Sequence, residues 1–383
     1  MRIAVNAVRI LVGVLFIVSG LVKANDPHGL SYKMQEFFEV WIGSLEASTF
    51  FARTALISLF QFLNAHSLGL SVLMNALEII AGVALLLGHW RRGVLWGLLA
   101  LIVFFTFLTA YAFLSGKFKN CGCFGDCLPI PPLASFFKDV ALLLLIIFLI
   151  LFQRYLQPVL ARPGRFFVLA VSVLFAFGFQ QLMLKNLPVA DCLPFKKGNN
   201  LEAQMKPPPG AVQDSFATVM VYAKGGKEYE FDAAKLPDDW ATYKYVRMST
   251  KLVRKGNAEP PIKGFSLMGP DGTDYTMPVL YEPKAVLVFV LDFDDLNDWL
   301  PDVKALYQKA RARNVPFFVV SHLASKGKVL LSAAGLPEVV VVTSDITPVR
   351  SAARVNPTVY LLEKGTVVEK VAYHRAGRVM EKL

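Results

Sequence analysis

Long apolar runs dominate the first half of the chain and are missing from the second half. Five windows consist almost entirely of apolar residues: Val5–Leu21, Ser71–Gly88, Gly93–Leu114, Phe136–Phe152 and Phe166–Leu184. Runs of roughly 17 to 25 such residues cross a bilayer as helices, so the pattern predicts a bundle of about five spans. Between the first two windows, apolar and polar residues alternate at helical spacing. This spacing predicts amphipathic helices on the membrane surface and leaves open a sixth, partial insertion.

The second half of the chain has a different rhythm. After residue 257, the runs "AVLVFVL", "VPFFVVS" and "EVVVVTS" are typical of buried strands, and helical stretches separate them. Strands that alternate with helices pair in parallel through crossover connections. The segment "VNPTVYLLEKGTVVEKVAYH" predicts an antiparallel hairpin, so the expected sheet is mixed. The predicted fold is a membrane α-helical bundle joined to an α/β domain with a mixed sheet.

The change in composition divides the chain into three parts. Residues 1–188 are expected to form the transmembrane domain, residues 189–257 a connector with short strands, and residues 258–383 the α/β domain. Within the connector, "KPPPG" is a stiff, turn-rich stretch and "FATVMVYA" is a strand candidate.

The composition also narrows the class of protein. With 55% hydrophobic and 18% charged residues, the chain lies outside the soluble class, so its excess apolar surface must face membrane lipid. The net charge of +11 is scattered along the polar half and at helix ends. Since no arginine-rich arm or aromatic-interleaved basic patch is present, we expect no nucleic-acid partner.

Basic residues predict the orientation of the spans. Seven arginines lie near the start of the first span or in the loops after the second and fourth: Arg2, Arg9, Arg91, Arg92, Arg154, Arg162 and Arg165. Such loops face the cytoplasm. The opposite, periplasmic side of the bacterial inner membrane then receives all four cysteines and the C-terminal domain. As an alternative, the chain start resembles a signal peptide with a cleavage site at Val22-x-Ala24.

Three of the four cysteines lie in the loop "NCGCFGDCLP" between the third and fourth spans. The tetrapeptide "DCLP" occurs at Cys127 and again at Cys192, which places these two cysteines at similar depths. We therefore expect a structural Cys127–Cys192 disulfide and a more reactive pair, Cys121 and Cys123, in a compartment where disulfides persist. A metal site is the other interpretation. The spacing lacks the usual Cys-x2-Cys pattern and no histidine is near in sequence, so we predict no metal.

One acidic residue lies inside a span. Glu78 is about one helical turn from Asn75 in the second window, and Lys23 or Lys138 could be its partner. A structural ion pair and a proton or quinone site are both open interpretations, because ionisable groups at this depth are costly and often functional. His28 is close enough in the predicted topology to meet the cysteine loop, although a solvated histidine is the simpler interpretation.

The C-terminal 125 residues or so resemble the thioredoxin-like fold of the TlpA and peroxiredoxin branch. The matching segments are "GFSL" with the following Asp271-Gly272, the strand Ala285 to Leu291, and Asn356-Pro357-Thr358. The resemblance implies a cis peptide bond at Pro357. The stretch Asp292 to Pro301 contains no cysteine where that fold carries Cys-x-x-Cys. This departure favours a binding or docking module over an oxidoreductase domain.

Residues 5 to 155 are similar to the DoxX/MauE family of membrane proteins. The resemblance rests on "RILVGVLFIVSGLVKANDPHG", Glu78, "CGCFG" and "FFKDVALLLL". Together with a fifth span and an exported thioredoxin-like domain, it is similar to proteins of the Bacteroidetes group. The family implies a redox-associated inner-membrane protein: MauE relatives are linked to maturation of methylamine dehydrogenase, and DoxX relatives to quinone-coupled complexes.

Two functions follow as expectations. In the first, the Cys121/Cys123 loop exchanges thiols and disulfides with exported proteins and a quinone accepts the electrons, although no cofactor motif is evident in the sequence. In the second, the protein is a non-enzymatic scaffold or assembly factor with structural cysteines, and its thioredoxin-like domain binds an exported or envelope protein. The sequence leaves open whether the chain is a thiol–disulfide oxidoreductase.

Overall fold

The N-terminal part of the protein is a bundle of long apolar helices. The computed structural model describes residues 1–118, 125, 127–128, 130–213, 215–232, 236, 239–254 and 256–383. Within these ranges, five helices are long and apolar enough to cross a membrane: α1 (Arg2–Ala24), α4 (Ser67–Leu87), α5 (Arg91–Ser115), α6 (Pro132–Leu151) and α7 (Arg162–Lys185). Each predicted window falls on one of these helices, so the five-span prediction is confirmed.

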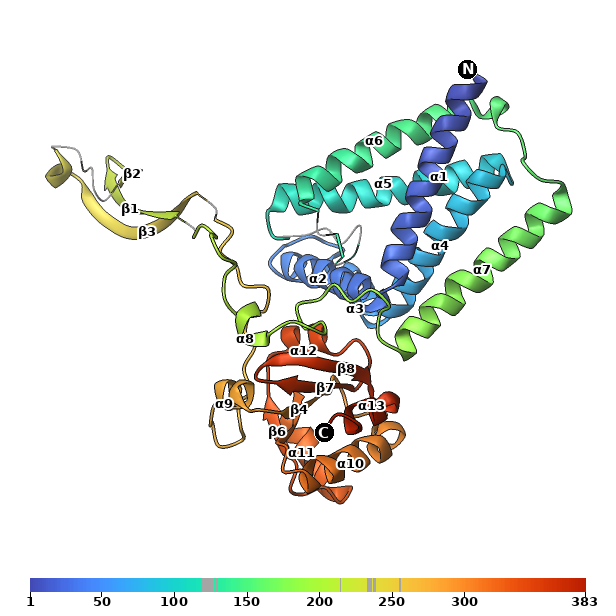
Figure 1. The fold of residues 1–383 in the computed structure, drawn as a ribbon. Coiled ribbons are helices and arrows are strands. Elements are labelled where there is room, and N and C mark those ends of the chain that lie inside the picture. Colours follow the sequence, from blue (N-terminus) through green and yellow to red (C-terminus); the bar gives the residue numbers. More distant parts are fainter. Residues whose placement is uncertain are drawn as a thin grey trace.

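Consecutive spans run in opposite directions through the bundle. The ends of α1, α5 and α7 lie beside the starts of α4 and α6, and we call this end the cysteine side. Figure 1 shows the N-terminus at the opposite end, away from the sheet domain. Arg9 lies within α1 and is 4% exposed. It donates hydrogen bonds to the carbonyls of Leu85, Leu86 and Gln157, so it joins the chain segments at the end away from the cysteines.

Glycines let α1 and α4 pack closely along their length. A Cβ atom on Gly82 would lie 2.8 Å from the carbonyl oxygen of Gly13, and a Cβ on Gly20 would lie 2.7 Å from Cγ1 of Ile79. Small residues at helix crossings allow this kind of approach in membrane bundles. The α1–α4 pair is the most closely packed contact of the bundle for this reason.

Two further helices cover the cysteine side. Helix α2 (Pro27–Glu46) begins with a proline in its first turn, and the Asp26 side chain accepts a hydrogen bond from the Gly29 N–H. Helix α3 (Arg53–Ala65) follows and packs against α2. Figure 1 shows α2 lying across the foot of the bundle. The predicted surface helices thus form a cover over one end of the spans.

The C-terminal domain contains a five-stranded mixed sheet. Its strands, in chain order, are β4 (Ala285–Phe289), β5 (Phe317–Ser321), β6 (Val340–Thr343), β7 (Thr358–Glu363) and β8 (Thr366–Ala372). Their spatial order is β6-β5-β4-β7-β8. Strands β4, β5 and β6 are parallel, and β4, β7 and β8 are antiparallel. The mixed sheet predicted from the sequence is confirmed.

Helices cover both faces of this sheet, because alternate residues of its buried strands point to opposite sides. One face carries α10 (Leu296–Ala312), α11 (Ala324–Ala333), the short turn η3 (Tyr373–Arg375) and α13 (Gly377–Met380). The other carries α8 (Leu201–Gln204), α9 (Thr276–Tyr281) and α12 (Ile346–Ala352). Each face has its own apolar core, with Val286 and Val288 in the first and Leu287 and Phe289 in the second.

The segment between the bundle and the sheet enters the sheet domain earlier than the expected connector suggests. A single-turn helix, η1 (Gln153–Tyr155), follows the fourth span. After α7, the chain continues into α8 of the sheet domain. Phe195 and Leu201 are buried in its second core, and the Leu201 N–H donates to the Gly365 carbonyl. Residues 195–204 therefore belong to the sheet domain.

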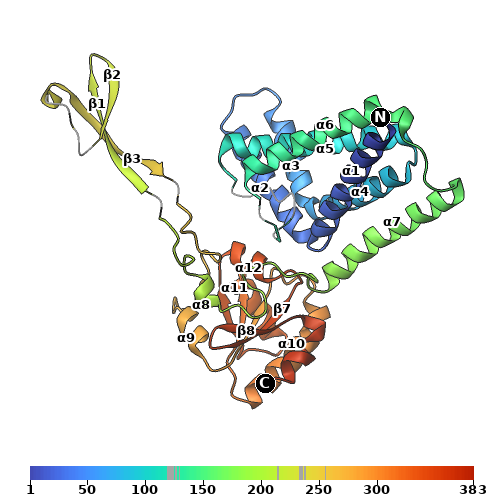
Figure 2. The ribbon, with the colours of Figure 1, turned by 45° about the horizontal axis from the view of Figure 1, so that its top comes forward.

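Residues 215–254 form a separate antiparallel sheet. Strands β1 (Ser215–Lys224), β2 (Lys227–Asp232) and β3 (Lys244–Arg254) pair in the order β2-β1-β3, with the turn η2 (Trp240–Thr242) before β3. Figures 1 and 2 show this sheet as an arm that extends away from the sheet domain. At its base, the Val212 N–H donates to the Asn257 side chain and the Asn257 N–H donates to the Val212 carbonyl. The chain therefore enters and leaves the arm at neighbouring residues.

Candidate functional site

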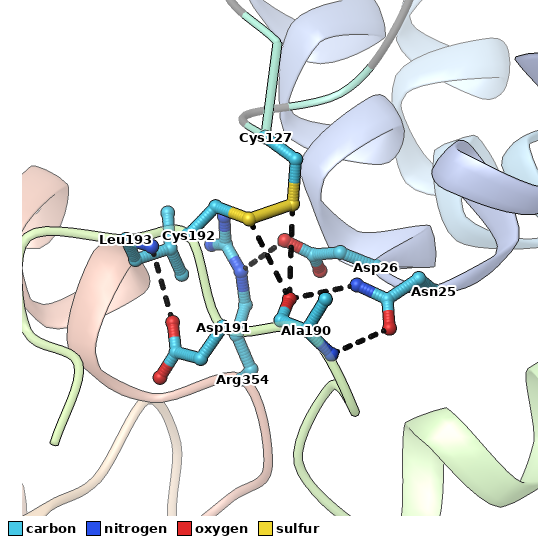
Figure 3. Close-up of a disulfide and its surroundings, with 8 residues drawn as sticks. All are labelled: Asn25, Asp26, Cys127, Ala190, Asp191, Cys192, Leu193 and Arg354. Carbon is cyan, nitrogen blue, oxygen red and sulfur yellow. Dashed lines mark hydrogen bonds and ion pairs between the residues drawn. A yellow bond between two sulfur atoms is a disulfide. The ribbon is translucent and has the colours of Figure 1, made fainter.

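A disulfide joins the loop between α5 and α6 to the segment that follows α7. It links Cys127 to Cys192 across 65 positions of sequence, with the two Cα atoms 4.9 Å apart. Cys127 is half-buried and Cys192 is exposed. Figure 3 shows the bond at the junction of the bundle and the sheet domain. Cys121 and Cys123, the predicted reactive pair, lie outside the described residues.

Side chains from the end of α1 hold the Cys192 segment in place. The Asn25 amide donates to the Ala190 carbonyl at 2.9 Å and accepts from the Ala190 N–H at 3.1 Å. This reciprocal pair, drawn in Figure 3, fixes the backbone two residues before Cys192. Both cysteine Sγ atoms lie 3.8 Å from the same Ala190 carbonyl.

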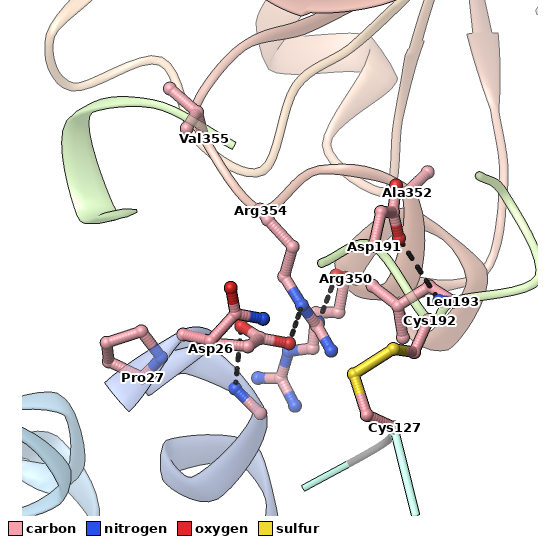
Figure 4. Close-up of polar contacts among 12 residues, drawn as sticks. Asp26, Pro27, Cys127, Asp191, Cys192, Leu193, Arg350, Ala352, Arg354 and Val355 are labelled. Atoms are coloured by element: carbon pink, nitrogen blue, oxygen red, sulfur yellow. Dashed lines mark hydrogen bonds and ion pairs between the residues drawn. A yellow bond between two sulfur atoms is a disulfide. The ribbon is translucent and has the colours of Figure 1, made fainter. Parts of the chain in front are cut away.

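A second contact joins the sheet domain to the start of α2. Arg354 follows α12, and its Nε lies 2.8 Å from Oδ2 of Asp26; the two side chains are 5% and 14% exposed. Figure 4 shows Arg354 reaching from the sheet domain to Asp26. The Arg350 and Arg354 guanidinium groups lie 5.0 Å and 5.3 Å from the ring centre of Tyr32, a cation–π arrangement. A desolvated, multi-partner contact of this kind orients the two domains.

The junction contains one more buried charge pair. Lys370 Nζ lies 2.6 Å from Oδ2 of Asp191, and the lysine side chain is 2% exposed. Burial lowers the pKa of Lys370, while the neighbouring Asp191 acts in the opposite direction. Asp191 directly precedes Cys192, so this pair anchors the disulfide segment on the sheet side as Asn25 does on the bundle side.

His28 lies at this junction. Its ring stacks on Tyr32 with the ring centres 5.7 Å apart. Burial lowers the pKa of His28 to about 4, and the Arg354 charge acts in the same direction while Asp26 opposes it. His28 therefore stays neutral near pH 7 and acts as a packing residue of the interface.

Pro357 lies in the loop between α12 and β7, and the Asn356–Pro357 peptide bond is cis. The Asn356 side chain accepts from the Leu291 N–H and donates to the Asp292 carbonyl, so this loop is held against the end of β4. No cysteine occurs in the stretch from Asp292 to Pro301. Arg354 lies in the same loop, so the edge of the sheet domain that carries Pro357 is the one joined to the bundle.

Two ion pairs lie inside the bundle near the cysteine side. Glu78 pairs with Lys23, and these side chains are 1% and 2% exposed. Lys138 pairs with its neighbour Asp139 at 2.8 Å. Of the two partners considered for Glu78, the structure selects Lys23. The four charged residues border one cavity of about 40 Å³, large enough for a water molecule.

Neighbouring groups satisfy most of these charges. Lys23 Nζ lies 4.5 Å from the ring centre of Phe105, and the Thr109 hydroxyl lies 3.1 Å from an Asp139 oxygen. Oε2 of Glu78 is buried with no hydrogen-bond partner among the described residues. Asn75, one turn away, donates instead to Gln180 of α7 and so links the fifth span to α4. A polar atom buried without a protein partner, beside a small cavity, is suited to a bound water.

A much larger cavity lies under the cover helices. It has a volume of about 720 Å³ and is enclosed by α2, α3, α4 and α5. Its walls are almost entirely apolar, and the aromatic residues among them are Phe37, Phe38, Trp41, Phe60, Phe104, Phe107 and Tyr111. Cavities of this size and character are typical of sites for small apolar ligands.

Two described residues of the cysteine loop contact the bundle, one next to this cavity and one beside the last turn of α1. Phe118, the last described residue before the loop cysteines, stacks on Phe37 with the ring centres 4.1 Å apart. Gly125, the first described residue after Cys123, lies close to Val22, since a Cβ there would be 3.7 Å from the Val22 side chain. Val22 precedes Lys23. The loop thus connects the wall of the cavity with the helix turn that carries the buried lysine.

The sequence analysis did not find several of these residues. Asp26 and Arg354 were not proposed as site residues, and each has its partner in the other domain. The cavity left a visible signal: in α2, Met34, Phe37, Phe38, Trp41 and Leu45 recur at helical spacing and all line it. Among the described residues, no group of three or more histidine, cysteine or acidic side chains is placed to hold a metal ion.

Comparison with known proteins identifies the bundle. Residues 1–152 match the family model of the methylamine utilisation protein MauE, and residues 216–255, the arm, match a domain of unknown function (DUF8463). No curated protein and no solved structure is significantly similar to the chain. The MauE match spans α1 to α6, while α7 and the sheet domain lie outside it. The chain is therefore a multi-pass membrane protein, and its first 152 residues are similar to MauE.

Proposed function

We propose that the protein is a thiol–disulfide oxidoreductase of the bacterial inner membrane. On the periplasmic side, its Cys121/Cys123 loop takes electrons from the thiols of exported proteins and passes them to a quinone. The observation that carries this proposal is the apolar, aromatic cavity of about 720 Å³ whose wall includes Phe37, the residue on which the base of the cysteine loop packs.

The reaction balances with a quinone as the oxidant. Two thiols of the substrate reduce a Cys121–Cys123 disulfide and leave as a disulfide themselves. The two loop thiols then give two electrons and two protons to the quinone, which becomes a quinol, and the loop disulfide forms again. The net change is one substrate disulfide and one quinol.

The cavity suits the ring and the first part of the tail of a quinone. Aromatic side chains offer faces on which a flat ring can stack. The Trp41 and Tyr111 side chains carry an N–H and an O–H that can donate to a quinone oxygen. The Ser44 hydroxyl instead donates to the Val40 carbonyl of its own helix. The cavity is lined by the spans α4 and α5 and by the cover helices α2 and α3, at the membrane surface where a lipid-soluble quinone can enter.

The buried ion pair places the Lys23 ammonium group in the helix turn beside the loop. Lys23 is at the last turn of α1, one residue from the Val22 contact with Gly125. An ammonium group in an apolar setting favours a nearby thiolate, which is the reactive form of a cysteine. The small cavity beside Glu78 can hold a water molecule, which could carry the protons of the reaction inside the bundle.

Quenching of Trp41 fluorescence tests the quinone site. In a variant with Trp90, Trp96, Trp240 and Trp299 replaced by Phe, Trp41 is the sole tryptophan. Decylubiquinone added to this variant in nanodiscs is expected to quench the emission saturably. The matched control keeps only Trp96, which is 60% exposed on α5, and its quenching should rise linearly with quinone in the lipid.

Filling the cavity provides the second part of this test. Leu63→Phe is expected to weaken quinone binding about tenfold. The larger ring would occupy part of the cavity, so either the quinone or the surrounding side chains must move. Leu144→Phe, on a side chain 61% exposed on α6, should leave binding unchanged. Linear quenching of Trp41, or equal affinity in both variants, would remove the quinone from the proposal.

A scaffold or maturation function is the second candidate. The specific observation in its favour is the docking of the sheet domain, through Arg354 and Asp26, by the edge that carries Pro357. The same nanodiscs separate the two functions. If dithiothreitol yields no quinol, and Cys121→Ser and Cys123→Ser alter only thermal stability, the scaffold function is the better account.

A further inference from the structure

We propose that the Cys127–Cys192 disulfide is a second exchangeable pair, the one that reacts first with the thiols of an exported protein. It would pass the electrons on to the Cys121/Cys123 pair. This inference rests on the proposed function and changes the role of the disulfide from a structural link to a reaction partner.

Access is the first argument. Cys192 is exposed and Cys127 is half-buried, in the surface depression that also includes Val22 and Asn25. Each sulfur lies 3.8 Å from the Ala190 carbonyl oxygen, and because a disulfide sulfur carries no hydrogen, this is a van der Waals contact. An incoming thiolate can therefore reach Sγ of Cys192 directly, whereas a disulfide with a purely structural role is protected by burial.

The junction does not need the covalent bond to stay assembled. Asn25 holds Ala190 with two hydrogen bonds, Lys370 pairs with Asp191, and Arg354 pairs with Asp26. These contacts fix the backbone just before Cys192. When the disulfide opens, Cys192 therefore keeps its place, and the Cys127 thiol can return to it.

The local charges and the chain itself favour the next step. Arg350 and Arg354 lie on the Cys192 side of the junction (Figure 4), and Lys370 pairs with the residue that precedes Cys192, so cations close to the disulfide favour thiolates. Cys127 follows Cys123 by four positions in one loop. A thiolate on Cys127 thus attacks the loop disulfide as an intramolecular reaction at high effective concentration.

The steps balance as follows. A substrate thiolate bonds to Sγ of Cys192 and breaks the bond to Cys127, which leaves as a thiolate. The second substrate thiol attacks the mixed disulfide, so the substrate departs oxidised and Cys192 is left as a thiol. Cys127 then attacks the Cys121–Cys123 disulfide, and Cys192 attacks the resulting bond to Cys127. The original pair forms again, and Cys121 and Cys123 remain as the thiols that the quinone oxidises.

Two reductants separate this relay from the proposed function. The full chain in nanodiscs with decylubiquinone receives dithiothreitol, which is small enough to reduce the loop directly, or reduced unfolded ribonuclease A. The Cys127→Ser/Cys192→Ser variant is expected to form quinol about tenfold more slowly or worse with ribonuclease and at the wild-type rate with dithiothreitol. The matched Cys121→Ser/Cys123→Ser variant should lose both reactions.

A trapping experiment on the wild-type chain avoids any effect of substitution on folding. A peptide with one cysteine cannot complete the exchange, so its mixed disulfide accumulates and mass spectrometry locates it after acid quenching. We expect the adduct on Cys192. An adduct on Cys121 or Cys123 alone, or a Cys127→Ser/Cys192→Ser variant that oxidises ribonuclease at full rate, would overturn the relay. Absence of quinol with dithiothreitol in the wild type would overturn the proposed function, while the adduct would still report on Cys192.

Discussion

Lys23 and Glu78 illustrate how two costly groups become compatible with the interior of a membrane bundle. Each side chain is almost fully buried, and a charge without a partner at this depth is strongly unfavourable. The pair together with the Phe105 ring replaces part of the lost hydration. Removing one member leaves the other charge buried and unpaired. The loss of unfolding free energy is therefore larger for a single substitution than for replacement of both residues.

Substitution of either residue should show this dependence. Glu78→Gln is expected to lower the free energy of unfolding by about 3–5 kcal/mol because it leaves the Lys23 charge buried. Lys23→Met with Glu78→Met should recover most of the loss. The measurement is thermal unfolding in detergent micelles. The surface pair Lys33–Glu36 provides the control, since Glu36→Gln should change stability by less than about 1 kcal/mol.

An unfolding free energy for Glu78→Gln equal to that of the wild type would contradict this account of the pair.

The sequence showed that Glu78 is unusual but did not decide its partner. Lys23 and Lys138 are both at the correct depth, and the choice depends on how α1, α4 and α6 rotate about their axes. Lys138 pairs with Asp139 instead, a neighbour on its own helix. The repeated "DCLP" identified Cys127 and Cys192 more easily. The motif occurs once between the third and fourth spans and once after the fifth span, and both places lie on the cysteine side. Asp26 and Arg354 could not be paired, since 328 positions separate them.

At the scale of elements, the close crossing of α1 and α4 depends on glycines, which have no side chain to hold the two backbones apart. Gly82 lies against the backbone of Gly13, and its other close neighbour is Ile17. Backbone cannot move aside as a flexible side chain can. The position therefore tests whether the close approach of these helices stabilises the bundle.

Gly82→Ala should lower the free energy of unfolding by about 1–3 kcal/mol, because its Cβ would lie 2.8 Å from the Gly13 carbonyl oxygen. Gly97→Ala is the matched control: it is also in a span, and no atom lies within 4 Å of its Cβ. That variant should be unchanged or stabilised by up to about 1 kcal/mol through helix propensity. Equal melting temperatures for the two variants would show that the helices separate at no cost.

The five spans and the mixed sheet could be predicted because bilayer thickness and strand periodicity impose regular patterns. Helix α12 was missed, since Pro348 interrupts its pattern. Proline is compatible with the first turn of a helix, where its missing N–H has no partner to lose. The omission mattered, because α12 positions both Arg350 and Arg354 at the junction. The arm was predicted only as short strands, since its exposed faces carry no clear apolar alternation.

For the whole molecule, the direction of the spans decides which compartment the disulfide faces. The ends of α1, α5 and α7 lie on the cysteine side, and the Arg91 and Arg154 loops lie at the other end. The arginine distribution predicts that this other end faces the cytoplasm. Exchange with exported proteins requires this orientation.

Labelling with a membrane-impermeant maleimide tests the orientation. In spheroplasts treated with a reductant, Cys192 should react because it is exposed and the predicted orientation puts it outside the membrane. In a variant with the four cysteines replaced by serine, Gln157→Cys should react only after the membrane is permeabilised, since Gln157 is exposed at the opposite end. Labelling of position 157 in intact spheroplasts, without labelling of Cys192, would invert the topology.

The closed base of the arm has a consequence for how this protein is built. Because the strands leave and return at neighbouring residues, Val212 and Asn257, the arm is inserted into the sheet domain without interrupting its core. Such an insert can be lost, lengthened or exchanged during evolution while the domain around it stays folded. The family match confined to residues 216–255 has the boundaries expected of a unit with its own history.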